Sequence, residues 1–322
     1  MIEAEVVCDS IGEHSPRLTT FRLRYPKFVH GELMTHRAFS RNASSSRAIP
    51  VSKNLEEVRS DELRAAPVWW GREQKGMQSG DELDDIELIY AGRDSNGISR
   101  QEAAKQQWRT AALHAAKNAE YLHEIGAHKS IINRILEPFL HINVVVTSCA
   151  PGLMNFFGLR LDKAAQPEIR ILAEYMWGAW NESNPEKLGP GEWHLPFIEW
   201  QGLQSDFDTR IAHEPLLQQC IKVSVARCAR TSYLSFDTGK RSTVEEDLAL
   251  YERLVGSQPG HFSPAEHQAT PDKWYPSQYA NDKDTDGFYE WPLQHGNLPG
   301  WRQYRKTLPG EAVAPLPEGY SL

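Results

Sequence analysis

Residues 18–23 read Leu-Thr-Thr-Phe-Arg-Leu, and their apolar and polar side chains alternate as they do along a half-buried β-strand. The strand-like text begins at Glu3, where Val6 and Val7 come first. Pro26 ends it, since proline has no amide hydrogen to offer a neighbouring strand. The chain therefore opens with strand structure, which we expect to form part of a sheet.

The next segment, Phe28 to Phe39, carries apolar residues at helical spacing. This pattern predicts a helix that would hold His36 and Arg37 at its end. The Ser- and Asn-rich text after it predicts a loop, because these side chains bond readily to nearby backbone and favour turns.

Further helical and apolar segments follow. Ser99 to Glu124 is the clearest helix, with Trp108, Ala112 and Ala116 on one stripe. Thr243 to Val255 is another, and its first turn is acidic, as the helix dipole prefers. The remaining segments are an amphipathic helix and two short apolar stretches, at Leu161–Trp180, Ile131–Leu136 and Ile142–Val146.

The composition changes between Asn181 and His213, where Pro, Gly and Trp become frequent. A chain of 322 residues has the length of about two domains. We therefore expect a core over residues 1–180 and a second lobe over residues 181–322, which could also complete the same fold.

The overall composition is that of an ordinary globular protein, with 40% apolar, 24% charged and 10% aromatic residues. Asp and Glu number 43 against 35 Lys and Arg, a net charge of −8, which argues against a global electrostatic grip on duplex DNA. Any anion must be held by a local site. No apolar run approaches the ~18 residues that span a bilayer, and the acidic first residues do not resemble a leader, so we expect a cytoplasmic protein.

The cysteines are too sparse for a disulfide framework and include no CxxC pair, so we expect reduced, mostly buried thiols. Neither Cys nor His has the short ligand spacing of a zinc site, and no metal is expected. The cysteines are Cys8, Cys149, Cys220 and Cys228.

The densest polar cluster reads Thr35-His-Arg-Ala-Phe-Ser-Arg-Asn-Ala-Ser-Ser-Ser-Arg47. Consecutive hydroxyls beside several guanidinium groups, on a turn that leaves a helix, can direct hydroxyl, backbone N–H and forked Arg donors at a phosphate. This cluster is therefore a candidate anion site. The alternative is a solvated loop whose Ser and Asn side chains only cap a helix.

A second cluster, Leu153-Met-Asn-Phe-Phe-Gly-Leu-Arg-Leu-Asp-Lys-Ala-Ala-Gln166, places Asn155 and Arg160 in an apolar segment. If that segment is buried, both polar groups need partners, because an unpaired charge is too costly in a core. A ligand is one candidate partner. A surface ion pair of Arg160 with Asp162 or Glu168 is the alternative.

These clusters resemble the motifs of the flavin-dependent thymidylate synthases (ThyX). His36-Arg-x-x-Ser-x-Asn-x-x-Ser-x-Arg47 is similar to the family's HRxxSxNxxSxR signature, and residues 153–169 are similar to its LMNFLxLRxDxxAQxEI helix. Arg134-Ile-Leu-Glu-Pro138, between them, resembles its ARxxLP segment. Three matches in the right order are stronger than any one of them.

Two further motifs are similar but stand late in the chain. Residues 226–233 (ARCARTSY) resemble the family's opening strand-turn AARVSF, and residues 260–267 (GHFSPAEH) resemble GHxSPFEH, which normally precedes the signature. The chain thus looks like a circularly permuted or N-terminally rebuilt member. Permutation is tolerated where chain ends lie close together at a surface.

The resemblance implies an α/β fold of the α+β type, in which helices flank a central antiparallel sheet. It also implies bound FAD and a homotetramer whose protomers share active sites. The implied reaction passes a one-carbon unit from methylenetetrahydrofolate to C5 of dUMP and gives dTMP. Reduced flavin supplies the hydride in that reaction, and NADPH recharges the flavin.

The resemblance also implies roles for individual residues. Arg160 corresponds to the arginine that holds the pyrimidine and favours its N3-ionised form, where a guanidinium stabilises the charge that develops as C5 becomes nucleophilic. The implied nucleotide site consists of Glu32, Ser44, Ser45, Ser46, Arg47, Arg134 and Arg160. The implied cofactor contacts are His36, Arg37, Asn42, Asn155, His261 and Ser263, with His261 near the folate entrance.

Several positions depart from the family pattern. Thr35 stands where the family has its leading Arg, and Glu32 stands where it has Gln. A carboxylate can accept a hydrogen bond from the cytosine amine, so methylation or hydroxymethylation of dCMP is an alternative to dUMP. The other departures are Ala43, Ala48, Cys149, Pro151 and Ala164.

A non-catalytic nucleotide- or single-strand-binding protein is a third hypothesis, because Trp and Tyr side chains can stack on bases. The acidic charge balance argues against it. The aromatic residues concerned are Trp69, Trp70, Trp274, Tyr275, Trp301 and Tyr304. Arg302 or Arg305 could replace the lost leading Arg, and the Trp69–Gln78 loop could be a lid or an oligomer contact.

Overall fold

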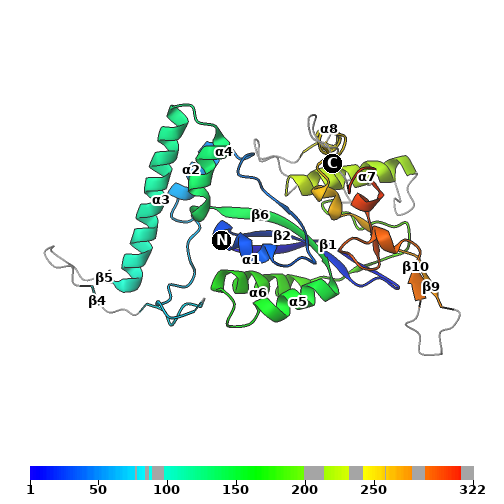
Figure 1. The fold of residues 1–322 in the computed structure, drawn as a ribbon, viewed down its shortest axis with the longest axis horizontal. Coiled ribbons are helices and arrows are strands. Elements are labelled where there is room, and N and C mark those ends of the chain that lie inside the picture. The colour runs from blue at the N-terminus through cyan, green and yellow to red at the C-terminus, as the bar shows by residue number, and fades with distance from the viewer. Residues whose placement is uncertain are drawn as a thin grey trace, which may run out of the picture.

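The computed structural model describes residues 1–76, 78–83, 87–88, 98–198, 214–231, 242–257, 259–277 and 287–312. At its centre lies a five-stranded sheet with the strand order β3–β6–β2–β1–β7 (Figure 1). Neighbouring strands are antiparallel except β1 and β7, which are parallel. The strands are β1 (Glu3–Gly12), β2 (Leu18–Pro26), β3 (Ser40–Ala43), β6 (His141–Cys149) and β7 (Glu186–Leu188). The strand structure predicted at the start of the chain is confirmed.

Two helices cover one face of this sheet (Figure 1), α5 (Ala150–Arg160) and α6 (Pro167–Glu182). Because side chains alternate along a strand, Phe21 of β2 points to this face together with Val144 and Val146 of β6. Each buried side chain of this size contributes about 1.5–3 kcal/mol to stability. This packing fixes the position of Arg160 at the end of α5.

Described elements from the later part of the chain cover part of the opposite face of the same sheet (Figure 1), whereas β7 belongs to the sheet itself. Val145 of β6 lies there in one cluster with Phe197, and Leu18 lies in another with Trp301. The elements of this layer include α7 (Glu214–Ala229), α8 (Val244–Val255), η5 (Ser263–Glu266), β8 (Ala269–Pro271), β11 (Trp301–Gln303) and η7 (Tyr304–Thr307). The α/β class with a mainly antiparallel sheet is thus confirmed, whereas the division at residue 180 stays a prediction.

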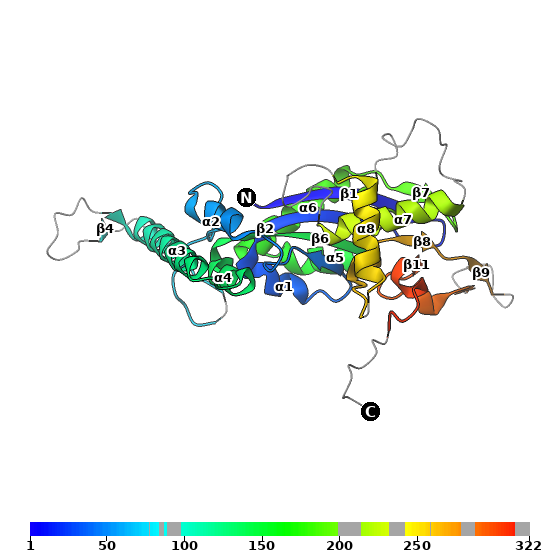
Figure 2. The same ribbon diagram turned by 90° about the horizontal axis from the view of Figure 1, so that it is seen from above.

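A helical cluster lies at one end of the sheet (Figure 2) and consists of α2 (Val51–Arg59), α3 (Arg100–Glu124) and α4 (Lys129–Leu136). Ser99 caps α3, since its hydroxyl accepts a hydrogen bond from the backbone N–H of Glu102 at 3.1 Å. Ala112 and Ala116 lie in the core of this cluster, and Trp108 packs against it. The predicted helix and its stripe are confirmed.

The helix predicted from Phe28 to Phe39 is too long. The structure has two short helices there, η1 (Lys27–Val29) and α1 (His30–Met34). The Arg41 guanidinium donates hydrogen bonds to the carbonyl oxygens of Met34 at 2.8 Å and His36 at 3.2 Å, which ends the helix. His36 and Arg37 therefore lie in the turn that follows it.

Three other boundaries differ from the predictions. Residues Ser40–Ala43, expected in a loop, form β3, because pairing with β6 outweighs local turn preference. Helix α6 begins at Pro167 and not at Leu161, since proline fits the first turn of a helix. Residues 226–233, which resemble the family's strand-turn, begin in the last turn of helix α7, which ends at Ala229. Residues 232 and 233 of this stretch lie outside the described part of the chain.

Helix α8 begins as predicted, with a capping box. The Thr243 hydroxyl accepts from the Glu246 N–H at 3.2 Å, and the Glu246 carboxylate accepts from the Thr243 N–H at 3.0 Å. The cysteines are free; Cys8 is partly buried and the other three are buried. The remaining short elements are η2 (Glu137–Phe139), β4 (Glu87–Leu88), β5 (Ile98–Ser99), β9 (Trp274–Pro276), β10 (Gly287–Tyr289) and η6 (Pro292–Gln294).

Within the ranges given above, no helix has both the length and the apolar character needed to cross a membrane.

Candidate functional site

The end of α1 and the end of α5 meet at one corner of the sheet. There the Arg160 Nε–H donates to Nε2 of His36 at 2.9 Å. A second guanidinium nitrogen of Arg160 donates to the Thr35 hydroxyl at 3.2 Å and to the Glu32 carbonyl oxygen at 3.4 Å. Two predicted site residues of the α1 region, Glu32 and His36, thus lie beside a third, Arg160, which stands 124 positions after His36.

His36 is neutral at this corner. Burial, reinforced by the positive charges of Arg160 and Arg41, lowers its pKa to about 4. Because Nε2 accepts the bond from Arg160, the ring proton lies on Nδ1. The ring stacks on Phe39 at 5.6 Å and meets the edge of Phe156 at 4.9 Å. His36 is therefore a fixed acceptor that orients the Arg160 guanidinium.

The same corner carries guanidinium groups without acidic partners. Arg37 is exposed and Arg160 is partly buried, and neither lies within 4.0 Å of a carboxylate in the described ranges. Arg41 is held by carbonyl oxygens only. Elsewhere arginines are usually paired, as Arg17 is with Asp9. In a chain of net charge −8, this local positive excess favours an anionic ligand.

The alternative of an Arg160 surface ion pair is wrong. The Asp162 carboxylate accepts from the Ala164 N–H at 2.7 Å, and the Glu168 carboxylate accepts from the Val68 N–H at 2.8 Å. Neither forms an ion pair with Arg160. Asn155 is exposed on α5 rather than buried, because the helix turns Phe156 and Phe157 toward the sheet instead.

The serine-rich turn follows the C-terminal end of β3, whereas the turn with His36 precedes its N-terminal end. Ser44 is buried and accepts from the Asn143 N–H at 3.2 Å, and the Ser46 carbonyl oxygen accepts from the Asn133 side chain at 2.6 Å. The Ser45 hydroxyl accepts from the Arg47 N–H at 3.3 Å, which leaves its proton free to donate. Arg47 and Arg134 are both exposed.

The serine-rich turn and the His36–Arg160 corner do not meet within one chain. The four residues of β3 separate them, and at ~3.3 Å per residue the strand alone spans about 10 Å. The serine turn with Arg47 and Arg134 is thus one half-site, and the His36–Arg160 corner is another.

Asn42 and Ser263, both predicted to contact a cofactor, lie together but are engaged with the protein. The Asn42 amide donates to the carbonyl oxygens of Cys228 at 2.8 Å and Ala229 at 3.3 Å, at the end of α7. The Ser263 hydroxyl donates to the Asn42 side-chain oxygen at 3.3 Å. Asn42 therefore joins β3 to the end of α7 and to η5.

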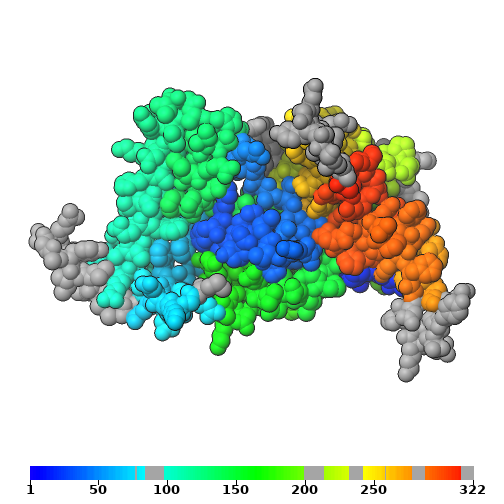
Figure 3. All heavy atoms as spheres, in the orientation of Figure 1, coloured from blue at the N-terminus to red at the C-terminus, as the bar shows by residue number. Residues whose placement is uncertain are grey.

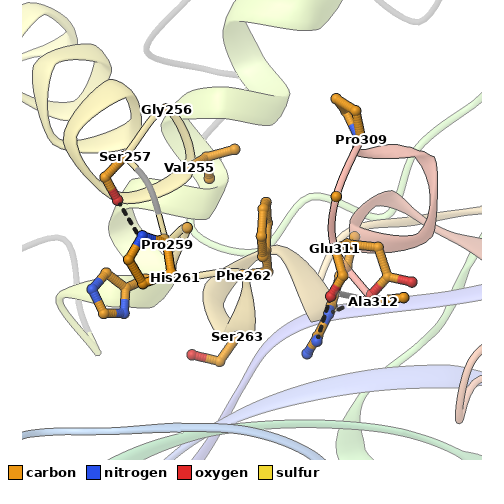
Figure 4. A pocket seen from close by; sticks show the side chains of 13 residues that line it. Val255, Gly256, Ser257, Pro259, His261, Phe262, Ser263, Pro309, Glu311 and Ala312 are labelled. Atoms are coloured by element: carbon orange, nitrogen blue, oxygen red, sulfur yellow. Dashed lines mark hydrogen bonds and ion pairs between the residues drawn. The ribbon is translucent and has the colours of Figure 1, made fainter. Parts of the chain in front are cut away.

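A cavity of about 580 Å³ lies beside η5 (Figure 4). His261 and Ser263 line it, and the Phe262 ring stands in its middle. The opposite wall is the segment around Glu311, whose carboxylate accepts from Arg305 Nε at 2.9 Å. Arg305 also pairs with Glu266, so it is not free to replace a lost arginine of the His36 turn.

Sequence reasoning did not single out Thr35 and Arg41 as site residues, although both stand in the first cluster. The signal that could have found Arg41 is a guanidinium placed a few residues after a helix end, where carbonyl oxygens need donors. Arg302, the other candidate replacement, bonds to the Gln294 side chain at 2.9 Å and lies over the Trp291 ring.

A pair of histidines lies buried on the other face of the sheet. His194 bonds through Nδ1 to the Ser10 hydroxyl at 2.9 Å and through Nε2 to Thr20 at 2.8 Å. Thr20 bonds to Thr147 at 2.6 Å, and Thr147 bonds to Nδ1 of His267 at 2.8 Å. Burial lowers the pKa of both histidines to about 3. This network is closed to solvent and belongs to the core.

Residues 9–186, more than half of the chain, match the family described as thymidylate synthase complementing protein. No curated protein matches.

Solved structures resemble the chain at low identity. A UMP/dUMP methylase from Streptomyces cacaoi, bound with 5-Br dUMP, is 20% identical over 56% of this chain and 90% of that chain, with a TM-score of 0.37. Thymidylate synthase X from Helicobacter pylori, with FAD and dUMP, is 17% identical over 51% of this chain and 67% of that chain, with a TM-score of 0.32.

Proposed function

Because the chain belongs to the family of thymidylate synthase complementing proteins, we propose that it is an enzyme that transfers a one-carbon unit to C5 of dUMP and gives dTMP. One observation carries this proposal. Inside the matched range, guanidinium groups without carboxylate partners surround a neutral, buried histidine, as a site for an anionic nucleotide requires.

Arg160 is the proposed catalytic residue. Its guanidinium would lie against the N3/O4 edge of the pyrimidine and stabilise the negative charge that develops as C5 becomes nucleophilic. The bond to His36 holds the guanidinium in place and leaves the ring uncharged, so the positive charge stays on Arg160. The C5 proton leaves, and a methylene carbon and a hydride take its place as a methyl group.

The proposed cofactors are FAD, methylenetetrahydrofolate and NADPH. A reduced flavin would supply the hydride, the folate the carbon, and NADPH the electrons that restore the flavin. The donors at the corner fit an anionic flavin, since Arg37 and Asn155 are exposed and form no bond with the protein in the described ranges. His261 is also exposed, at its cavity. Asn42 does not fit, because its amide hydrogens already bond to the end of α7.

A second subunit is proposed to complete the site. The serine turn, Arg47 and Arg134 would hold the phosphate of a nucleotide whose base lies against Arg160 of another protomer. Their separation by β3 within one chain supports this arrangement. On α5, Met154 is 50% exposed and Leu159 is 55% exposed, and such side chains are suited to contact another copy in a homotetramer.

A cytosine nucleotide, such as dCMP, is the second candidate substrate. The Glu32 carboxylate has no hydrogen-bond partner among the described residues, although the Glu32 carbonyl oxygen bonds to Arg160. That carboxylate could accept a bond from the 4-amino group of cytosine. Parallel incubations with dUMP and dCMP, followed by mass spectrometry of the products, distinguish the two, and turnover of dUMP alone removes dCMP.

The decisive experiment combines colour and turnover. We expect the purified protein to be yellow and to release tritium from 5-tritiated dUMP when methylenetetrahydrofolate and NADPH are supplied. A colourless protein that binds no FAD at micromolar concentration contradicts the proposal. A protein that binds nucleotide but releases no tritium from dUMP or dCMP supports the non-catalytic hypothesis instead.

A further inference from the structure

A cavity of about 700 Å³ lies where the end of β1 meets the segment 271–275. Its walls come from residues 11–15, 187–190 and 271–275, so it shares no residue with the sites described above. Figure 3 shows the orange atoms around the segment 271–275 beside dark blue atoms from the start of the chain, at the opposite end of the molecule from α3. The cavity has the size of a small-molecule site.

Aromatic and aliphatic side chains form much of the wall of this cavity. The His14 ring stacks on the Trp274 ring, with 4.5 Å between the ring centroids. On β10, a Cβ atom at Gly287 would collide with the Trp274 ring, so this ring lies directly against the neighbouring strand. Leu188 and Pro271 add aliphatic surface. The Trp274 ring is therefore held in place without a ligand, and the wall suits an apolar body.

Asp272 places a buried carboxylate in the wall of the same cavity, and the residue is only 3% exposed. Its Oδ2 accepts hydrogen bonds from the Trp291 backbone N–H at 2.8 Å and from Nε2 of His295 at 2.9 Å. Its Oδ1 is buried and has no hydrogen-bond donor in the described part of the chain. The Asp272 side chain thus anchors residues 291–295 through one oxygen and leaves the other available to a ligand.

The negative charge of Asp272 has no cationic partner. Nδ1 of His295 accepts from the Gly300 N–H at 3.0 Å, so Nε2 carries the only ring proton and His295 adds no positive charge. Within the ranges that the structure describes, no Lys or Arg nitrogen lies within 4.0 Å of the Asp272 carboxylate. Because an unbalanced charge is costly when buried, a cationic N–H donor in the cavity would find a prepared acceptor.

Charges of both signs stand at the rim of the cavity. Lys273 lies 3.7 Å from the Glu290 carboxylate, which offsets its charge. Glu13 is exposed and adds a negative charge. Lys187 is exposed and forms no ion pair among the described residues. A carboxylate on the ligand would pair with Lys187, whereas a simple amine would not use it.

We infer that this cavity binds an organic ammonium ion with an apolar body. The ammonium group donates to Oδ1 of Asp272, and the apolar body packs against Trp274 and the aliphatic wall. Simple amines and free α-amino acids share this chemistry. Lys187 distinguishes the two, because only the amino acid carries a carboxylate. The inference uses no residue of the proposed catalytic site and goes beyond the proposed function.

Calorimetric titration of the full chain with phenethylamine, L-phenylalanine and 3-phenylpropanoate tests this site, because these probes share a phenyl ring and differ in their charged groups. We expect at least one of the two amines to bind with a Kd below about 1 mM and 3-phenylpropanoate to bind at least about tenfold more weakly. Tighter binding of L-phenylalanine identifies an amino acid, and equal or tighter binding of phenethylamine identifies a simple amine. Absence of binding by both amines, or equal binding of 3-phenylpropanoate, overturns the inference.

Three variants locate the binding. Asp272→Asn keeps an oxygen for the two protein donors but loses the charge, and we expect the affinity for the better amine to fall about tenfold or more. Trp274→Leu is expected to weaken binding about fivefold or more through lost contact with the ring. Lys187→Glu reverses an exposed charge, so phenethylamine should bind about twofold or more tightly and L-phenylalanine about threefold or more weakly. If Asp272→Asn does not fold, the other two variants decide.

Lys117→Glu is the matched control for Lys187→Glu, because Lys117 is an exposed residue of α3 outside the cavity and the net charge changes equally. Its affinity for each probe should equal that of the wild type. If Trp274→Leu binds the active probe as the wild type does, or if both lysine variants change the affinity equally, the ligand lies elsewhere and the inference is overturned. Because the readout is binding, failure of the proposed turnover does not affect it, and failure of binding leaves the proposed turnover standing.

Discussion

Two regions of this molecule hold neutral histidines, and they differ in what surrounds them. His36 lies at an open corner, where Arg160 and Arg41 add to the effect of burial on its pKa. His194 and His267 lie in the core, where hydroxyl groups bond to them and burial alone dominates their pKa. A lowered histidine pKa therefore marks an open, positively charged corner in one region and a closed hydroxyl network in the other.

The difference lies in the neighbouring charge. The corner keeps guanidinium groups without acidic partners at the surface, where they can pair with a bound anion. The core network contains hydroxyls and no unpaired charge, and one ring nitrogen, Nε2 of His267, lacks a partner. The corner is thus suited to binding and the network to stability.

Acid should act mainly through the core network. The pKa of His194 and His267 is about 3 in the fold but near 6.5 when unfolded, so the unfolded chain binds more protons in between, and stability falls as the pH falls. The two protons of this network contribute about 3 kcal/mol of unfolding free energy per pH unit at the steepest point, and the proton of His36, whose pKa is about 4, adds about 1.4 kcal/mol. Urea unfolding between about pH 6 and 4 measures this slope.

The matched variant for this prediction is His267→Gln, which removes one titrating group. Its slope should be lower by about 1.4 kcal/mol per pH unit. An unchanged slope would show that carboxylates, and not the histidines, govern acid unfolding.

Replacement of Arg160 should act on turnover and spare the fold. Arg160→Gln removes the charge from the proposed pyrimidine site, and we expect kcat to fall about 100- to 1,000-fold. Its bonds to Thr35 and Glu32 are partly exposed, so the unfolding free energy should change by less than about 1 kcal/mol. Tritium release and urea unfolding of the same sample provide both values.

Arg302→Gln is the control for Arg160→Gln, because Arg302 bonds to Gln294 away from the corner. Its turnover should remain close to that of the wild type. An Arg160→Gln enzyme with full kcat would remove Arg160 from the proposed mechanism.

Replacement of Thr147 should show the opposite pattern. Thr147→Val removes the hydroxyl that links Thr20 to His267, and the unpaired groups should cost about 1–3 kcal/mol of stability. Thermal unfolding measures the loss. Thr307→Val, at an exposed threonine, should change stability by less than about 0.5 kcal/mol. Equal losses in the two variants would contradict the importance of the network.

The smallest effect is expected at the serine turn. Arg47 is exposed and forms no ion pair among the described residues, so Arg47→Ala should leave the melting temperature almost unchanged. The proposed phosphate contact predicts that the KM for dUMP rises roughly five- to tenfold while kcat is kept. Unchanged KM and kcat would place the phosphate elsewhere.

Local patterns predicted much of the fold. The alternation at residues 18–23 predicted a strand, and the Ser99 and Thr243 caps predicted helix starts, because each signal acts within a few residues. The end of α1 could not be predicted in this way. It depends on Arg41, which itself is placed by the pairing of β3 with β6.

The sequence predicted which residues form the candidate site better than it predicted how these residues are arranged. The clusters named His36 and Arg160, but their contact joins positions 124 residues apart, which no local pattern encodes. The engagement of Asn42 by the end of α7 is likewise a long-range contact. Long-range packing also separated the serine turn from Arg160, since β3 lies between them.

The short length of β3 has a consequence for how copies of this chain can associate. Both borders of the sheet are brief, with β3 of four residues at one side and β7 of three at the other. Arg41 and Lys187 add charge at these borders, and short, charged edges resist strand-to-strand aggregation. Self-association through extended strands is therefore disfavoured, and oligomers would form through helical surfaces instead.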